Sequence, residues 1–299
     1  MLECGICTIA VPFFFFASGF FLAGHTCEEG WYRREVGKRV VSLLVPYFMV
    51  ASAWLLFGSF LRLIAHFCFN AKLESLLCDP LLVQYGISLS ECPSLHPLWY
   101  VRALFVLVLC SPLLVAVQKS RWALLCLFIV YGWICPGPTG EGFVHGLTRC
   151  GILPLAGLFY FTLGIYSRRH GMDYVYAKSV HVALLLVGLV LFALQALFAS
   201  RHCLHAQHFG WLGIPFALWG AWGLIPNAKW PAGLVSNAFA VYLIHKFFYA
   251  IRGCVMGDEV SCLWKYFLFS VLMFLLSLLV ANGLKKLFPR FARIAFGGR

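Results

Sequence analysis

The chain has 299 residues, only 11% of them charged, and a mean hydropathy of +0.87. Soluble domains carry about 25% charged residues, so this chain has too little polar surface to cover a globule in water, and a soluble fold is excluded. The net charge of +12 would fit a nucleic-acid-binding protein, but the basic residues stand in short clusters between apolar runs, so we predict no nucleic-acid partner.

Apolar segments follow one another along the whole chain, most of them close to the roughly 20 residues that a membrane span requires. They cover residues 5–24, 40–64, 97–118, 121–135, 150–167, 179–199, 209–226, 235–252 and 263–284. No linker or repeat separates them. We therefore predict an all-α transmembrane helix bundle of about nine helices, in contact with membrane lipid and forming a single domain over residues 1–299.

The loop charges predict the orientation of this bundle. Sorting the Lys and Arg residues between alternate loops places 15 on one side and 4 on the other. The positive-inside rule puts the richer side in the cytoplasm, with the C-terminus inside and the N-terminus outside. An outside N-terminus without a signal peptide is unusual, and it predicts that a preceding span is missing.

The densest cationic patch is the loop over residues 31–39, which contains Arg33, Arg34 and Arg39. These residues can serve topology alone, or they can bind phosphate groups on the cytoplasmic face. The small pair Ser18 and Gly19 interrupts an aromatic segment, where close helix packing is the simplest use.

Polar side chains within the spans are candidates for function because they are costly in a bilayer. Arg102 follows Trp99 near the outer edge of the third span, and it either extends to the interface or faces the interior to hold an anionic or hydroxyl-rich group. His245 is either a packing residue or a general base, and it shares one broad helix face with Asn237 and Tyr242.

Cysteines and histidines give weaker signals. Cys4 and Cys7 have C-x-x-C spacing without a second ligand pair nearby, and the three histidines His202, His205 and His208 have no matching thiolate or carboxylate. A disulfide between Cys78 and Cys92 is conceivable. We predict no metal site. No hydrolase, nucleotide-binding or zinc-protease motif occurs.

Several segments, in order along nearly the whole chain, resemble the acyltransferase type 3 family of integral-membrane acyltransferases. They are Val11–Leu22, Arg39–Tyr47, Leu98–Phe105 with Pro112, Phe159–Arg168 and Ala240–Lys246. The resemblance implies transfer of an acyl group, often acetyl from acetyl-CoA, to a hydroxyl of a cell-envelope carbohydrate or lipid-linked glycan. It also implies a location in the bacterial inner membrane.

The resemblance gives each candidate residue a role. Arg33, Arg34 and Arg39 would hold the phosphates of acyl-CoA. Trp99, Arg102 and Tyr242 would line the acceptor or acyl side, and His245 matches the histidine of the late Tyr-Leu-x-His segment of the family. The family's first helix, with an arginine and a histidine taken as the catalytic base, has no counterpart here, so a truncated or inactive acyltransferase-like scaffold is one alternative. A transporter with proline-broken helices is another. The sequence leaves the oligomeric state open.

Overall fold

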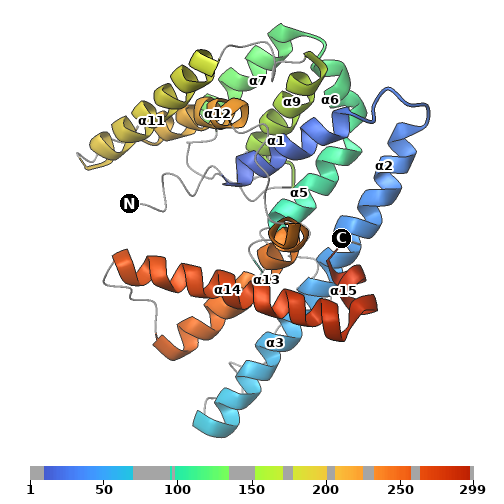
Figure 1. Cartoon of the computed structure of the whole chain (residues 1–299), viewed down its shortest axis with the longest axis vertical. Coiled ribbons are helices and arrows are strands. Elements are labelled where there is room, and N and C mark those ends of the chain that lie inside the picture. The colour runs from blue at the N-terminus through green and yellow to red at the C-terminus, as the bar shows by residue number, and fades with distance from the viewer. Residues whose placement is uncertain are drawn as a thin grey trace. The chain divides into compact units, whose positions relative to one another are not determined.

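The computed structural model describes residues 10–69, 95, 98–134, 152–170, 178–200, 206–224, 232–256 and 263–296. Every element in these ranges is a helix and none is a strand, which confirms the predicted all-α fold (Figure 1). The chain divides into two compact units. Unit 1 comprises Met1–Gly37 and Ala103–Ala228, and unit 2 comprises Lys38–Arg102 and Lys229–Arg299. A single domain over residues 1–299 stays a prediction.

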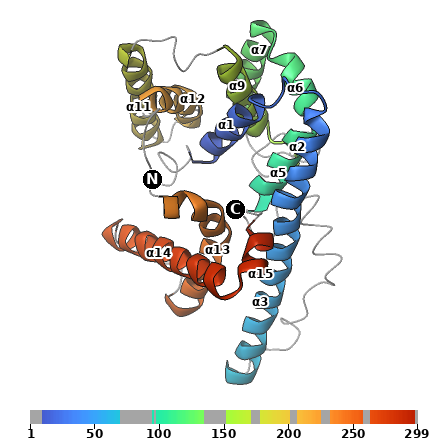
Figure 2. The same cartoon turned by 45° about the vertical axis from the view of Figure 1, so that its right-hand side comes forward.

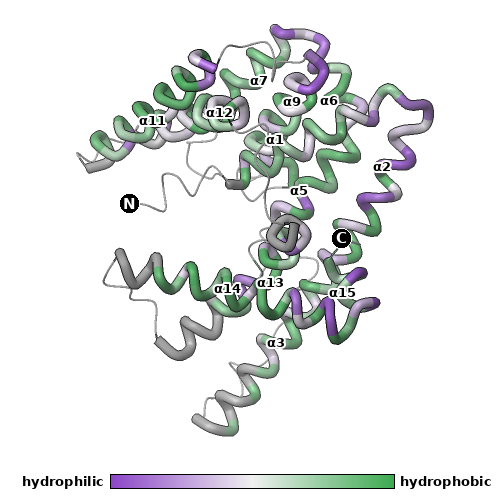
Figure 3. Tube along the Cα trace, viewed as in Figure 1, coloured by the Kyte–Doolittle hydropathy of each residue, from purple (hydrophilic) through white to green (hydrophobic). Residues whose placement is uncertain are grey.

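Each predicted apolar segment contains a helix. These helices are α1 (Ala10–Ala23), α3 (Val45–Phe69, preceded by the π-helical turn η3 over Val40–Leu44), α5 (Leu98–Leu109) with α6 (Ser111–Val117), α7 (Arg121–Ile134), α9 (Leu155–His170), α11 (Lys178–Ser200), α12 (Ala206–Leu224), α13 (Ala232–Met256) and α14 (Leu263–Leu287). Two shorter helices, α2 (Trp31–Arg39) and α15 (Pro289–Ala295), are among the segments that Figure 3 colours as hydrophilic.

Length and composition single out a smaller set of membrane spans. Within the described residues, three helical stretches are long and apolar enough to cross a bilayer: Trp31–Phe60, Lys178–Phe198 and Leu268–Leu287. The bent pair α5 and α6 makes a fourth if it is counted as one span. Of the other helices, α9, α12 and α13 coincide with predicted spans, as do α1 and α7, which are apolar but shorter.

The basic segment over residues 31–39, predicted to be a loop, is the helix α2 and runs on through η3 into α3. Its charged residues are mainly Arg, Lys and Glu, which have high helix propensity, so charge alone was the wrong guide to a loop here.

The third predicted span is bent by 68° at Cys110. Pro112 lacks the N–H that would pair with the Val108 carbonyl, and the Ser111 hydroxyl donates to that oxygen instead, at 2.6 Å. The Leu109 carbonyl also loses its helical donor, because the Leu113 N–H bonds Cys110. The Tyr32 hydroxyl donates to Leu109 at 3.0 Å, so α2 closes the bend in unit 1.

In unit 1, α1 and α9 lie next to each other (Figure 2), and two glycines form their contact. A Cβ atom on Gly19 would overlap the Phe161 carbonyl, and one on Gly164 would overlap the Phe16 carbonyl. The predicted packing role of Gly19 is therefore what the structure shows. At the same end of both helices, the Arg169 guanidinium donates to the Thr26 hydroxyl at 2.7 Å.

A second buried network in unit 1 supplies the hydrogen bond that the proline inside α12 removes. Pro215 cannot donate to the Trp211 carbonyl four residues earlier. The Tyr131 hydroxyl of α7 donates to that carbonyl at 3.1 Å, and it lies 2.7 Å from the Tyr160 hydroxyl of α9. Both tyrosines are fully buried. The network ties α7, α9 and α12 together.

Unit 2 is held together around α13. A small apolar core joins Ala240 of α13 to Ala281 of α14 and to Ala292, Ala295 and Phe296 at the C-terminal helix α15. The Asn237 amide donates to the Asn282 side chain at 2.8 Å, and the Lys285 ammonium donates to the Ser236 carbonyl, also at 2.8 Å. These bonds hold α13, the helix that carries the candidate site, against α14.

Candidate active site

His245 lies on α13, half-buried, with its ring held by the helix itself. Its Nδ1 atom is 2.6 Å from the Tyr242 carbonyl oxygen and 3.3 Å from that of Val241. A carbonyl oxygen only accepts, so Nδ1 is the donor, and in the neutral ring the lone pair is on Nε2. This tautomer is the one that a general base working through Nε2 requires.

Tyr242 connects His245 to a second helix. Its ring lies 6.0 Å from the His245 ring and packs edge-on against Tyr100 of α5, with centroids 5.7 Å apart. Tyr100 in turn contacts Trp99, at 6.5 Å between centroids. Tyr100 was not predicted as a site residue, although its position between Trp99 and Arg102 in a largely apolar helix was a usable signal.

A third helix of unit 2 reaches α13 close to His245. Trp54 of α3 packs edge-on against Phe247, with centroids 5.1 Å apart, and Phe57 lies 5.4 Å from the same ring. The His245 segment therefore lies among aromatic side chains of α3 and α5. We name the set Trp99, Tyr100, Tyr242 and His245, which these ring contacts connect, the His245 cluster.

Arg102 is 7% exposed and Trp99 is 5% exposed. An arginine extending to the membrane interface would have an exposed guanidinium, so this burial favours the interior interpretation. Buried guanidinium groups are rare in membranes and are associated with function. The roles of Arg102 and Trp99 in substrate binding stay predictions.

The predicted phosphate-binding arginines lie on α2. Arg33 and Arg34 are exposed, but Arg34 forms an ion pair with Glu28 and a 3.3 Å bond to the Glu29 carbonyl. At 3.6 residues per turn, Arg33, Arg34 and Lys38 fall within an arc of about 140°, and Arg39 lies about 100° beyond it. The cationic face of α2 therefore consists of Arg33, Arg34 and Lys38, and Arg39 lies off it. Lys38 was not among the predicted site residues.

The predicted cysteine and histidine candidates do not form part of this site, and most of them lie outside the described residues. Cys4, Cys7, Cys78, Cys92, His202 and His205 belong to the latter group. His208 lies at the start of α12. Within the described part of the chain, no three His, Cys, Asp or Glu side chains come together as metal ligands would.

The family comparison decides what kind of protein carries this arrangement. A model of the acyltransferase domain of the type 3 family matches residues 2–282. The chain belongs to the acyltransferase type 3 family. Its apolar helices make it a membrane acyltransferase. No curated protein and no solved structure matches it.

Family membership gives the His245 cluster a chemical context without assigning its residues. An acyltransferase needs a group that removes a proton from the acceptor. Within the described residues of unit 2, His245 is a half-buried imidazole that lies against the tyrosines of the cluster and has its tautomer fixed. Its place in the reaction stays a prediction.

Proposed function

We propose that this acyltransferase moves an acyl group, acetyl in the first instance, from acyl-CoA to a hydroxyl of a cell-envelope carbohydrate or lipid-linked glycan. The observation that carries the proposal is the 2.6 Å contact between His245 Nδ1 and the Tyr242 carbonyl, which leaves Nε2 as the basic nitrogen.

The chemistry follows from that tautomer. Nε2 of His245 accepts the proton of the acceptor hydroxyl, while the oxygen of that hydroxyl attacks the thioester carbonyl. A C–O ester bond forms and the C–S bond breaks. The coenzyme A sulfur leaves as a thiolate and takes the proton back from the imidazolium, so the histidine ends in its starting state.

Trp99, Arg102 and Tyr242 would hold the acceptor or the acyl group. A guanidinium donates several hydrogen bonds in a fixed plane, which suits the hydroxyls of a sugar or the oxyanion that develops on the thioester carbonyl. An indole face suits the apolar face of a sugar ring. The burial of Trp99 and Arg102 supports this, because water would weaken both interactions.

The cationic face of α2 would bind the phosphates of coenzyme A. Arg33 is exposed and Arg34 has an exposed partner in Glu28, which a phosphate would replace. In the predicted orientation α2 is cytoplasmic, where acyl-CoA is made, in the inner membrane of a bacterium. Arg39 is also one of the predicted phosphate ligands, but it lies off this face and is therefore the least favoured of the three arginines as a ligand.

Deleting the gene tests the proposal. We expect the loss of alkali-labile O-acyl esters from an envelope glycan and their return when the gene is supplied on a plasmid. An unchanged ester content in every envelope glycan would contradict the proposal.

A transporter is the second candidate, and the 68° bend at Cys110 favours it, since broken helices commonly line transport sites. Uptake of a substrate into proteoliposomes without acyl chemistry would support it. The two freed carbonyls at the bend already accept hydrogen bonds from Ser111 and Tyr32, however, which lowers their capacity to coordinate an ion.

A further inference from the structure

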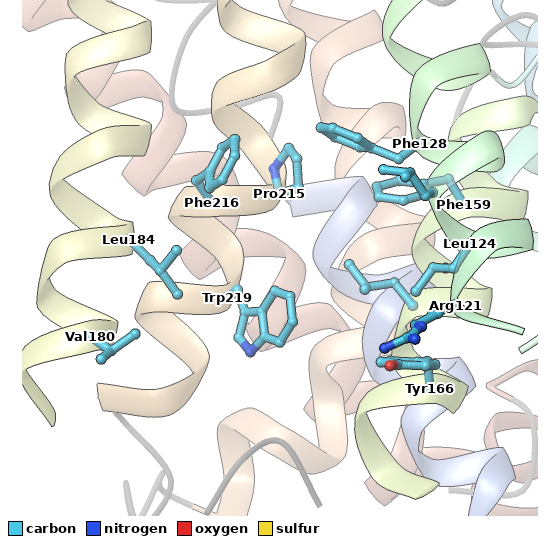
Figure 4. Close-up of a pocket in the computed structure, with 12 residues that line it drawn as sticks. Arg121, Leu124, Phe128, Phe159, Tyr166, Val180, Leu184, Pro215, Phe216 and Trp219 are labelled. Carbon is cyan, nitrogen blue, oxygen red and sulfur yellow. The ribbon is translucent and has the colours of Figure 1, made fainter. Parts of the chain in front are cut away.

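A pocket of about 560 Å³ lies inside unit 1, between α7, α9, α11 and α12. Its volume is within the roughly 300–1,000 Å³ usual for small-molecule sites. Leucine, phenylalanine, valine and proline side chains form most of its wall, and among the described lining residues Arg121 alone is charged. Figure 4 shows Arg121 and Tyr166 at one end and Phe128 and Phe159 at the other.

The end of the pocket at Arg121 coincides with the ends of helices. Arg121 is the first residue of α7, Tyr166 lies in the last part of α9, and Val180 lies in the first turn of α11. Lys119 and Lys178 flank the same helix ends. These lysines and Arg121 all belong to the loops that the charge distribution places in the cytoplasm.

The charge of Arg121 is not balanced by acid in the surrounding helices. No described residue of α7, α9, α11 or α12 is Asp or Glu. Arg168 packs over the Phe20 ring at 5.2 Å and Arg169 bonds Thr26, so these two cations serve the contact with α1. The Arg121 guanidinium lies 5.8 Å from the Trp122 ring, at an exposed position that an anion can approach.

The side of the pocket opens on an apolar surface. Leu125 and Val180 line the pocket and are 46% and 37% exposed. On α7 the neighbouring exposed side chains are also apolar, with Ile129 and Trp133 at 60% and 81%. An opening bordered by such residues admits hydrocarbon from the bilayer more readily than a soluble molecule.

We propose that this pocket binds one anionic glycerophospholipid, with an acyl chain between α7 and α12 and its phosphate group at Arg121. A chain with a phosphate at one end matches the apolar wall and the single cation. This site is separate from acyl transfer, since it uses none of the residues assigned to that reaction.

The net charge of the headgroup sets the selectivity, because phosphatidylcholine has the same phosphate but its choline ammonium offsets the charge that Arg121 would meet. Lipid tails are as apolar as the pocket wall, so moving a chain from the bilayer into the pocket gains only packing. A basic side chain near the headgroups of an anionic lipid is worth a change of about fivefold in binding. We expect phosphatidylglycerol to be preferred over phosphatidylcholine with the same chains by about this factor.

Native mass spectrometry of the full chain, exchanged with equimolar phosphatidylglycerol and phosphatidylcholine of identical chains, measures this preference. The wild type should retain one phosphatidylglycerol in excess. Arg121→Gln should bring the two lipids to near equality, and Leu184→Phe, which fills the pocket, should lower the retention of both. The matched control Arg290→Gln, at an exposed position of α15, should keep the wild-type ratio.

Quenching by brominated acyl chains locates the bound lipid. In detergent, with one brominated phosphatidylglycerol bound per chain, no bulk lipid reaches the exposed Trp133 ring. The quenched fraction should then fall in Trp219→Phe, whose indole lines the pocket, more than in Trp133→Phe. Equal retention of both lipids by the wild type, or an unchanged preference in Arg121→Gln, would overturn the proposal. Equal quenching losses in the two Trp variants would overturn the location. A matching melting temperature for each variant excludes misfolding as the cause.

Discussion

Single side chains replace the hydrogen bonds that prolines remove from this protein's helices. Pro112 and Pro215 each free a carbonyl in an apolar helix, and Ser111 and Tyr131 donate to those carbonyls. An unpaired carbonyl is costly where water is absent, so these donors stabilise the bent and proline-containing helices.

Replacing Tyr131 by Phe removes the donor to Trp211 while keeping the ring. We expect a loss of about 1 kcal/mol in the free energy of unfolding, the usual size of a hydrogen bond within a membrane protein. Tyr160→Phe should cost less, because Tyr131 can still donate to Trp211. Unfolding by SDS in mixed micelles measures both, and an equal or reversed order would contradict the network.

Arg102→Lys keeps a charge but loses the planar set of donors. If Arg102 binds the acceptor or the oxyanion, acyl transfer should fall by about tenfold or more, the equivalent of one charged hydrogen bond. The same substitution at exposed Arg290 is the matched control. Steady-state kinetics on folded protein measures the effect, and full activity in Arg102→Lys would remove Arg102 from the site.

Among the helices, the packing directions agree with the alternation of loop charges. The contacts of Gly19 with Phe161 and of Thr26 with Arg169 make α1 and α9 parallel, as two odd-numbered predicted spans should be. The helix α7 is antiparallel to α9 and to α12. Its C-terminal end, at Tyr131, contacts the first half of α9 and of α12, and its N-terminal end, at Arg121, lines the pocket together with residues from their second halves. The short segment 121–135 therefore fits the predicted order of spans.

The contact between α1 and α9 depends on the absence of a side chain at Gly19. Gly19→Ala must push apart two helix backbones, at a cost of about 1–3 kcal/mol in the free energy of unfolding. At Gly58 of α3, an added Cβ atom would meet no neighbouring atom within 4 Å among the described residues, so Gly58→Ala is the matched control and should be neutral or stabilising. Equal stability of the two variants would contradict the close contact.

Across the part of the molecule that the structure describes, the exposed cations lie on α2 and α15 and at the ends of other helices. Arg33→Gln with Arg34→Gln should raise the KM for acyl-CoA several-fold, and the difference from wild type should shrink at high salt, because salt screens exposed charges. The matched control is Arg290→Gln with Arg293→Gln on α15. An unchanged KM would remove α2 from donor binding.

Much of this architecture could be predicted from the sequence, because hydropathy determines where helices lie in a bilayer. The helix α2 was missed because its charges were interpreted as a loop. The bend at Cys110 was expected only within the transporter alternative, as one of several proline-broken helices, because Pro112 stands inside a continuous apolar run. The partners of Tyr242 and Tyr131 were also missed. Such contacts depend on which helices become neighbours, and apolar helices in lipid carry little sequence information about that.

A transfer assay with labelled acetyl-CoA tests most directly whether His245 is the base for acyl transfer. Purified membranes containing the full chain should move a radiolabelled acetyl group from acetyl-CoA to an envelope glycan, and His245→Asn should lower the rate by at least about a hundredfold, as expected for loss of a general base. His208→Asn, the same change on α12, should retain the wild-type rate. Transfer by His245→Asn at the wild-type rate, from protein that folds normally, would contradict this mechanism.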